Sequence, residues 1–262
     1  MTQRRTLLLT NDDGVCAPGL RALHEALRDN FDVVVAAPDT DMTGVAHAVT
    51  LLTPLRYEAL PSHNGMDGFK IFGTAADCVK FAAAHLLSRK PDIVVSGMNP
   101  GENSGVSVFY SGTVAAAREG AFWQIPSFAF SISDGGWEHL KEYCRKAATL
   151  VQQILSMQSP ELTRSKNCPY YNINFPACAP HRSRGVKVVR QSFATFADRY
   201  LQKKDPQGGE QFWLRGLKQA VESSMSFDTR ALLEGYVAVT PLDLDTTSQD
   251  SVEALRGHEQ LS

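Results

Sequence analysis

Long apolar runs and an excess of one charge are both missing from this sequence of 262 residues. No apolar stretch approaches the roughly 18 residues of a membrane-spanning helix, and the polar start 1–5 is not followed by a signal-peptide core. Lys plus Arg number 26 and Asp plus Glu 28, so the formal net charge is only −2. Such a balance gives no sign of nucleic-acid binding. We therefore expect a cytoplasmic protein that binds neither membranes nor nucleic acid.

Several cysteine and nucleotide motifs are also missing. The five cysteines show no CxxC spacing, which argues against a disulfide framework and a zinc knuckle, and a Cys168–Cys178 pair is disfavoured in a reducing compartment. The sequence has neither the GxxxxGK[ST] of a Walker loop nor the GxGxxG dinucleotide fingerprint. A nicotinamide-dependent oxidoreductase is therefore disfavoured.

What is present up to about residue 156 is an alternation of strand and helix signals. Apolar runs without polar alternation, typical of parallel strands covered on both faces, lie at 5–10, 32–37, 91–96 and 126–131, with a shorter candidate at 68–72. Helical spacing of apolar residues follows Pro18, Gly73 and Thr113, and recurs from Leu140 to Ile154. This alternation predicts an α/β fold with a doubly wound, mostly parallel sheet.

After residue 157 the rhythm changes. Strand-like pieces at 170–175, 186–190, 211–214 and 236–240 are separated by long polar connections. We expect residues 1–156 to form the catalytic core and residues 157–262 a β-rich part with hairpins. The basic stretch 181–204 fits either a solvated or subunit-contact surface or a docking site for an anionic substrate or product.

The segment 7–14 reads Leu-Leu-Leu-Thr-Asn-Asp-Asp-Gly, a buried strand that ends in two adjacent carboxylates, Asp12 and Asp13. Neighbouring carboxylates repel each other, and an unpaired buried carboxylate is costly. A cation at this strand end removes both problems. The sequence therefore predicts a divalent metal at the carboxyl edge of the sheet.

Two further strand ends carry oxygen side chains, namely Thr43 after the strand 32–37 and Asn99 after the strand 93–96. Ligands of open α/β sheets lie outside the carboxyl ends of the strands. Carboxylate, amide and hydroxyl oxygens favour Mg²⁺ or Mn²⁺ over zinc or copper. The loop that holds Thr43 also has the composition of an ordinary turn. Among the histidines, only His47 lies near these residues in sequence.

A Gly/Asn/Ser-rich loop at 96–105 is followed by Ser111, Gly112 and Thr113 at the start of a helix. Glycines let backbone N–H groups approach a ligand, and a helix N-terminus favours an anion. The alternative is that Ser111 or Thr113 only caps the helix. A metal beside such an anion site indicates hydrolysis of a phosphate ester.

These segments resemble those of the SurE (survival protein E) nucleotidase family. The resemblance rests on 8–14, Gly-Thr-Ala-Ala-Asp-Cys-Val at 73–79, Val-Ser-Gly-Met-Asn at 95–99, Gly-Glu-Asn-Ser-Gly at 101–105 and 110–120, and extends to Asp228 and 234–242. The sequence departs from the family pattern at Thr43, where serine is usual, and at Ala75, where proline is usual. A threonine hydroxyl can still bind a metal.

The resemblance implies a metal-dependent phosphatase acting on nucleoside 5′- and 3′-monophosphates, with short polyphosphate a further substrate of some members. One divalent ion per subunit, Mg²⁺ or Mn²⁺, would be held by Asp12, Asp13, Thr43 and Asn99. The phosphate would contact Asn99, Asn103, Ser111, Gly112 and Thr113. The catalytic residues would be Asp12, Asp13 and Asn103, with Asp12 handling the proton of the attacking water.

The fold that it implies is a Rossmann-like, three-layer α/β domain with C-terminal β-hairpin extensions and a terminal helix. The hairpins would exchange between the subunits of a homodimer or homotetramer, and the chain would form one SurE-like domain.

Two other mechanisms stay open. Asp12 could act as a nucleophile, as in haloacid-dehalogenase-type phosphatases, but those space their two aspartates by one residue, whereas adjacent residues of a strand point to opposite faces. The chain could also be a non-catalytic regulatory module that binds phosphate or nucleotides. Such a sensor has less need of adjacent carboxylates beside an anion site.

Overall fold

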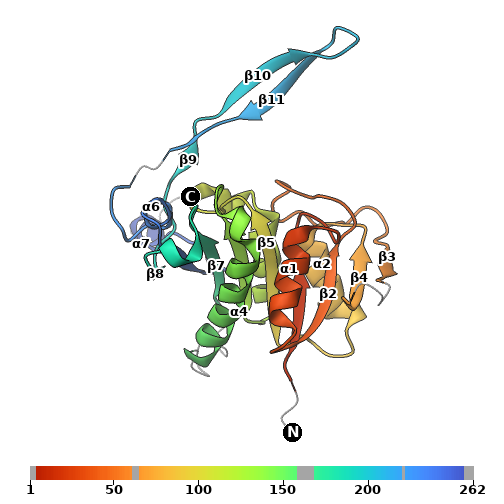
Figure 1. Cartoon of the computed structure of the whole chain (residues 1–262). Coiled ribbons are helices and arrows are strands. Elements are labelled where there is room, and N and C mark those ends of the chain that lie inside the picture. The colour runs from red at the N-terminus through yellow and green to blue at the C-terminus, as the bar shows by residue number, and fades with distance from the viewer. Residues whose placement is uncertain (1–3, 61–64, 158–167, 220–221, 257–262) are drawn as a thin grey trace.

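The computed structural model describes residues 4–60, 65–157, 168–219 and 222–256. A nine-stranded sheet in the order β3-β4-β2-β1-β5-β6-β7-β13-β8 forms its centre (Figure 1). Its strands are β1 (Thr6–Thr10), β2 (Asp32–Pro38), β3 (Tyr57–Ala59), β4 (Gly68–Ile71), β5 (Ile93–Pro100), β6 (Ser127–Ile132), β7 (Tyr170–Phe175), β8 (Val186–Val188) and β13 (Val237–Leu242). From β4 to β7 the neighbouring strands are parallel, whereas β3 and β13 run antiparallel to β4 and β7.

Helices cover both faces of this sheet. Alternate strand residues point to opposite faces, so Leu7 and Leu9 pack with α1 (Pro18–Leu27) and α4 (Leu140–Met157). Leu8 lies on the other face, with α2 (Ala75–Phe81) and α3 (Gly112–Phe122), and a π-helical turn at Ala82–Leu86 continues α2. The predicted fold class, a three-layer α/β fold with a mostly parallel sheet, is confirmed.

The chain reverses its direction of travel across the sheet between β1 and β5. It passes outward from β1 through β2 to β4, then returns to the other side of β1 and continues through β5, β6 and β7. The carboxyl ends of β1 and β5 therefore flank a topological switch point, where open α/β sheets bind ligands.

The C-terminal part, expected from residue 157 on, contributes strands to the same sheet as the core. All six residues of β7 are buried, and β7 pairs in parallel with β6 along its whole length. β13 and β8 then extend the same sheet. The sequence did not show that the sheet continues, because β7 and β13 are far apart in sequence and long polar segments separate them.

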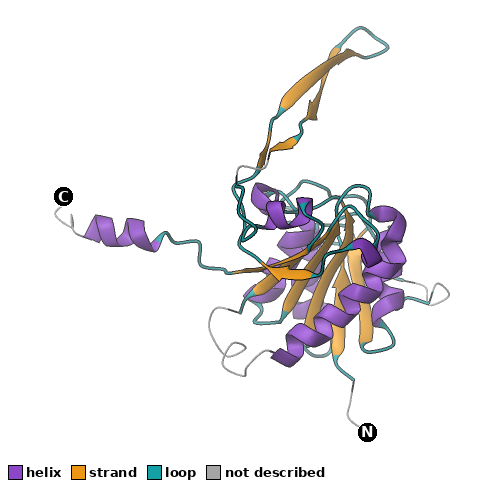
Figure 2. Cartoon of the chain, turned by 60° about the vertical axis from the view of Figure 1, so that its left-hand side comes forward, coloured by secondary structure: helices purple, strands orange, loops and turns teal. Residues whose placement is uncertain are grey.

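The predicted hairpin and terminal helix lie outside the sheet. The hairpin, called the arm here, pairs β10 (Arg199–Lys204) with β11 (Glu210–Arg215), and its stem pairs β9 (Thr195–Phe196) with β12 (Lys218–Gln219). Figures 1 and 2 show the arm projecting from the body, and Figure 2 shows α7 (Gln249–Arg256) at the end of an extended segment. The remaining short elements are the 3-10 helices Gly105–Phe109 (η3), Trp137–His139 and Pro180–Arg182, and α6 (Asp228–Leu233).

All five cysteines carry free thiols, so Cys168 and Cys178 do not pair. None of the helices in the described part of the chain is long and apolar enough to cross a membrane.

Candidate active site

A cavity of about 390 Å³ lies at the switch point, and most of the predicted site residues line it. Its lining comprises Asp12, Asp13, Asp41, Thr43, Gly44, Asn99, Pro100, Gly101, Glu102, Asn103, Ser107, Tyr110, Ser111 and Phe196. A larger cavity of about 530 Å³, between β8 and the end of β13, has a single carboxylate, Asp243, in its lining. Chemistry and position at the sheet edge, not volume, identify the cavity at the switch point as the candidate site.

Asp12 is packed against the first turn of α3. Its side chain is 2% exposed, and the Thr113 hydroxyl donates a hydrogen bond to Asp12 Oδ1. A Cβ added to Gly112 would lie 2.7 Å from Asp12 Cβ, closer than real contacts allow. Glycine at position 112 is therefore what lets the carboxylate reach the helix N-terminus.

Asp13 follows Asp12 at a turn completed by Gly14, whose φ of +101° favours glycine. Its Oδ2 is buried and has no hydrogen-bond partner in the described part of the chain. Burial, followed by the charges of Asp12 and Asp41, raises the pKa of Asp13 to about 7. Burial also raises the pKa of Asp12, against the opposing effect of the Thr113 hydrogen bond. Both carboxylates thus lack a compensating positive charge.

The loop after β2 crosses this site. Met42 N–H donates to the Asp12 carbonyl oxygen at 2.8 Å, and Ala46 N–H donates to the Tyr110 carbonyl oxygen at 3.1 Å. Within the loop, the Thr43 hydroxyl and backbone N–H both donate to Asp41 Oδ1, at 2.6 and 2.8 Å. The loop therefore brings Thr43 to the cavity, as predicted, and adds Asp41.

His47 anchors the far end of the loop and does not line the cavity. Its Nε2 lies 2.9 Å from Glu119 Oε2, and the Glu119 side chain is 1% exposed. Lys80 Nζ and Trp123 Nε1 donate to the other oxygen of Glu119. These contacts tie the loop to the body of α3.

Asn99 and Asn103 are held differently. Asn99 Nδ2 donates to the carbonyl oxygen of Gly101 at 2.6 Å, so its Oδ1 is the atom left for a ligand. Asn103 Nδ2 donates to Ser131 Oγ at 2.8 Å, and its backbone N–H donates to Asn174 Oδ1 at 2.7 Å. The ends of β6 and β7 therefore position Asn103 in the cavity wall.

Ser111, Gly112 and Thr113 divide between the cavity and the layer behind it. Ser111 lines the cavity and also caps α3, because its Oγ accepts a hydrogen bond from Val114 N–H. The capping role that the sequence left open is thus present. Its O–H can still donate to a ligand. Gly112 and Thr113 contact Asp12 and are not part of the lining.

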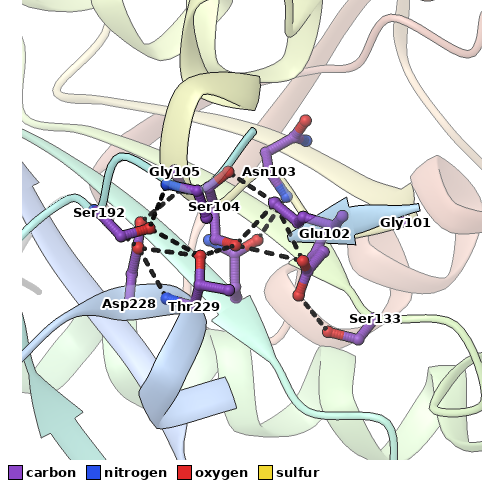
Figure 3. Close-up of polar contacts among 12 residues, drawn as sticks. Gly101, Glu102, Asn103, Ser104, Gly105, Ser133, Ser192, Asp228 and Thr229 are labelled. Atoms are coloured by element: carbon purple, nitrogen blue, oxygen red, sulfur yellow. Dashed lines mark hydrogen bonds and ion pairs between the residues drawn. The ribbon is translucent and has the colours of Figure 1, made fainter. Parts of the chain in front are cut away.

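A polar network ties the loop 101–105 to the C-terminal part (Figure 3). The Asp228 carboxylate is fully buried and accepts hydrogen bonds from the backbone N–H groups of Gly105, Ser192 and Thr229, at 2.7–2.9 Å. Ser104 Oγ lies 3.0 Å from Thr229 Oγ1. Residues more than a hundred positions apart thus fix one wall of the cavity.

These donors fit a hard divalent cation. No group of three or more His, Cys, Asp and Glu side chains in the described ranges is arranged to hold a metal by itself. A ligand set in this cavity would combine carboxylates with amide and hydroxyl oxygens, and Asp12, Asp13, Asn99 and Thr43 all line it. The unpartnered Asp13 Oδ2 and the mutual repulsion of the carboxylates are the features that a cation would satisfy.

A family model described as survival protein SurE matches residues 7–198. The chain belongs to the SurE family. Among similar curated proteins, the 5′-nucleotidase SurE of Desulfatibacillum aliphaticivorans is 38% identical over 250 residues, covering 95% of this chain and 96% of the relative. That of Syntrophobacter fumaroxidans is 40% identical over 250 residues, covering 95% and 97%. A SurE crystal structure from Aquifex aeolicus superposes with a TM-score of 0.80 at 35% identity and covers 97% of this chain and 99% of its own.

Sequence reasoning assigned no site role to several residues that line the cavity of this SurE chain, among them Asp41, Glu102 and Phe196. Asp41 stood in a loop whose composition fits any turn, although its clustered oxygen side chains were a usable signal. Glu102 lay inside a recognised motif without an assigned role. Phe196 had no local signal, because only the fold brings β9 to the cavity.

Proposed function

We propose that this SurE-family chain is a metal-dependent phosphomonoesterase that hydrolyses nucleoside 5′-monophosphates to nucleoside and phosphate. The observation that carries the proposal is the uncompensated pair of a buried Asp12 and a partly buried Asp13 in a cavity lined with amide and hydroxyl groups. The name 5′-nucleotidase, carried by the curated relatives, supports the substrate class. We extend the proposal to 3′-monophosphates and short polyphosphate, because the same groups would bind any terminal phosphoryl group.

Asp12, Asp13, Asn99 and Thr43 would hold one Mg²⁺ or Mn²⁺ per subunit. When bound, such an ion polarises a phosphoryl oxygen and lowers the pKa of a coordinated water.

The chain's own residues would bind and orient the ester. The Ser111 hydroxyl, which faces the cavity, would donate a hydrogen bond to a phosphoryl oxygen. Gly112 and Thr113, which contact Asp12, would act by positioning that carboxylate. Asn103, held by Ser131 and Asn174, would orient the phosphate for in-line attack. Asp12, which lines the cavity, would accept the proton of the attacking water.

The test is phosphate release from a nucleotide panel with Mg²⁺, Mn²⁺, Co²⁺ or EDTA. We expect metal-stimulated release from AMP, and a loss of about a hundredfold or more in Asp13→Asn. Asp39→Asn is the matched control, because Asp39 pairs with Lys70 at 3.1 Å outside the cavity. Near-normal turnover by Asp13→Asn, or full activity in EDTA, would refute the proposed mechanism.

We also propose that the arm joins subunits into a homodimer or homotetramer. Its exposed side chains include Tyr200, Phe212, Trp213 and Leu214, apolar groups that a second copy could cover. The cytoplasmic location stays a prediction from composition.

A further inference from the structure

Among the described residues that line this cavity, two are aromatic, Tyr110 and Phe196, and the others are polar residues, glycines and Pro100. Phe196 belongs to β9, at the stem of the arm, far in sequence from the predicted metal and phosphate ligands. Its side chain remains 40% exposed. The phosphate-binding role assigned to this cavity does not use an aromatic face.

Phe196 is held in place by its neighbours. It lies directly opposite Lys218 in the β9–β12 pair, so both side chains project from the same face. Lys218 Nζ lies over the ring, 5.6 Å from its centroid. Backbone hydrogen bonds from Ala197 N–H to Leu217 O, and from Val106 N–H to Ala194 O, fasten the stem together and to η3.

Lys218 is itself locked to the loop that lines the cavity. Its side chain is 12% exposed, and Nζ lies 2.6 Å from the Ser104 carbonyl oxygen, 2.8 Å from Ser104 Oγ and 3.0 Å from Glu102 Oε1. A nearly buried ammonium with three oxygen partners is a rigid support. The ring above it is therefore presented to the cavity in one orientation.

We propose that Phe196 is the stacking platform for the nucleobase and so determines that the site prefers nucleotides over other phosphate esters. The inference rests on the proposed nucleotidase function. A fixed aromatic face stacks on the π-face of any base and needs no hydrogen-bond readout. Phe196 lines the same cavity as Asn103 and Ser111, so one cavity would take up both the base and the phosphate.

The experiment compares AMP with ribose 5-phosphate, which carries the same phosphate ester and no base. In Phe196→Ala we expect KM for AMP to rise about tenfold or more, whereas kcat/KM for ribose 5-phosphate changes far less. Phe196→Tyr restores the KM for AMP, since it keeps an aromatic face. Adenosine inhibits the wild type competitively and inhibits Phe196→Ala more weakly.

Phe193→Ala is the matched control, because Phe193 lies in the same segment, is 76% exposed and is not part of the cavity lining. An equal loss of kcat/KM on AMP and on ribose 5-phosphate would overturn the inference, and so would an unchanged KM for AMP. The inference would also fail if Phe196→Ala changed the oligomeric mass and this change explained the loss of activity on both substrates. If the wild type released phosphate from no ester in Mn²⁺, the proposed function would fail instead. Calorimetric titration with adenosine would then still test Phe196, and equal binding by wild type and Phe196→Ala would count against the platform.

Discussion

Asp13 is a carboxyl group whose charged form is disfavoured by its surroundings. Its pKa of about 7 in the folded protein lies above the value of 3.8 expected in an unfolded chain, because the carboxyl is buried beside Asp12 and Asp41. Between these two pH values the folded state holds a proton that the unfolded state has released. The contribution of Asp13 to the stability of the metal-free protein is therefore fully present below about pH 4 and is lost as the pH rises through about 7.

This linkage predicts that metal-free Asp13→Asn is more stable than the wild type at pH 8. After allowance for solvent screening of a partly exposed group, we expect a gain of about 1–2 kcal/mol in the free energy of unfolding. Thermal melts in EDTA between pH 5 and pH 8 measure it, with Asp39→Asn as the control. If the melting temperatures of wild type and Asp13→Asn differed by the same amount at every pH in this range, the raised pKa of Asp13 would be contradicted. Added Mn²⁺ should reverse the order of the two proteins at pH 8, because the metal binds the deprotonated carboxylate.

At the residue scale, the residues that could be predicted were those whose side chains differ sharply from their neighbours in sequence. Adjacent aspartates at the end of an apolar strand are conspicuous, so Asp12 and Asp13 were found. The indirect role of Thr113 was not, because its hydroxyl serves Asp12 through a contact between positions 101 residues apart. Whether a hydroxyl faces a ligand or a neighbouring carboxylate depends on such long-range packing.

At the scale of elements, the site depends on segments that are far apart in the sequence. Asp228, at the first turn of α6, fastens the loop that carries Asn103 by accepting three backbone N–H groups, of which Gly105 N–H belongs to that loop (Figure 3). Because a buried carboxylate with several backbone donors is hard to replace, its loss should move the loop as well as weaken the fold.

Asp228→Asn tests this coupling. The amide must place an NH₂ group against at least one backbone N–H, so we expect a loss of about 2–3 kcal/mol in the free energy of unfolding. Phosphate release from AMP should fall together with stability, whereas Asp205→Asn, in the turn of the arm, should affect neither strongly. Thermal melts and AMP kinetics on both variants decide it. A variant as stable and active as the wild type would show that the network does not hold the loop.

The sheet illustrates which elements a sequence can reveal. Strands β1, β2, β5 and β6 are continuous apolar runs and were predicted within a few residues, because burial on both faces leaves a plain signature. The sequence did not predict that β8 and β13 belong to the central sheet. β8 has a half-exposed, unremarkable sequence and enters the sheet only by pairing with β13, about 50 residues later.

For the whole molecule, the arm is a part whose strands bury nothing against the rest of the chain that the structure describes. It is a two-stranded ribbon with six residue pairs, and every residue of β10 and β11 is exposed. An isolated hairpin is marginally stable in water. The terminal helix α7 also has no buried residue and stands apart from the body (Figure 2). Both features make sense if a second copy packs against them.

Replacing Trp213 and Leu214 together by serine tests this view of the arm. These side chains are 49% and 52% exposed in the single chain, so the substitution removes little packing within it. We expect the wild type to form a dimer or tetramer at micromolar concentration and the double variant to shift towards the monomer, as measured by light scattering. Thermal unfolding of the wild type should depend on protein concentration, because assembly would stabilise only the folded state, and that of the double variant should depend on it less. A wild-type monomer, or an unchanged mass in the variant, would mean that the exposed face of the arm serves another partner.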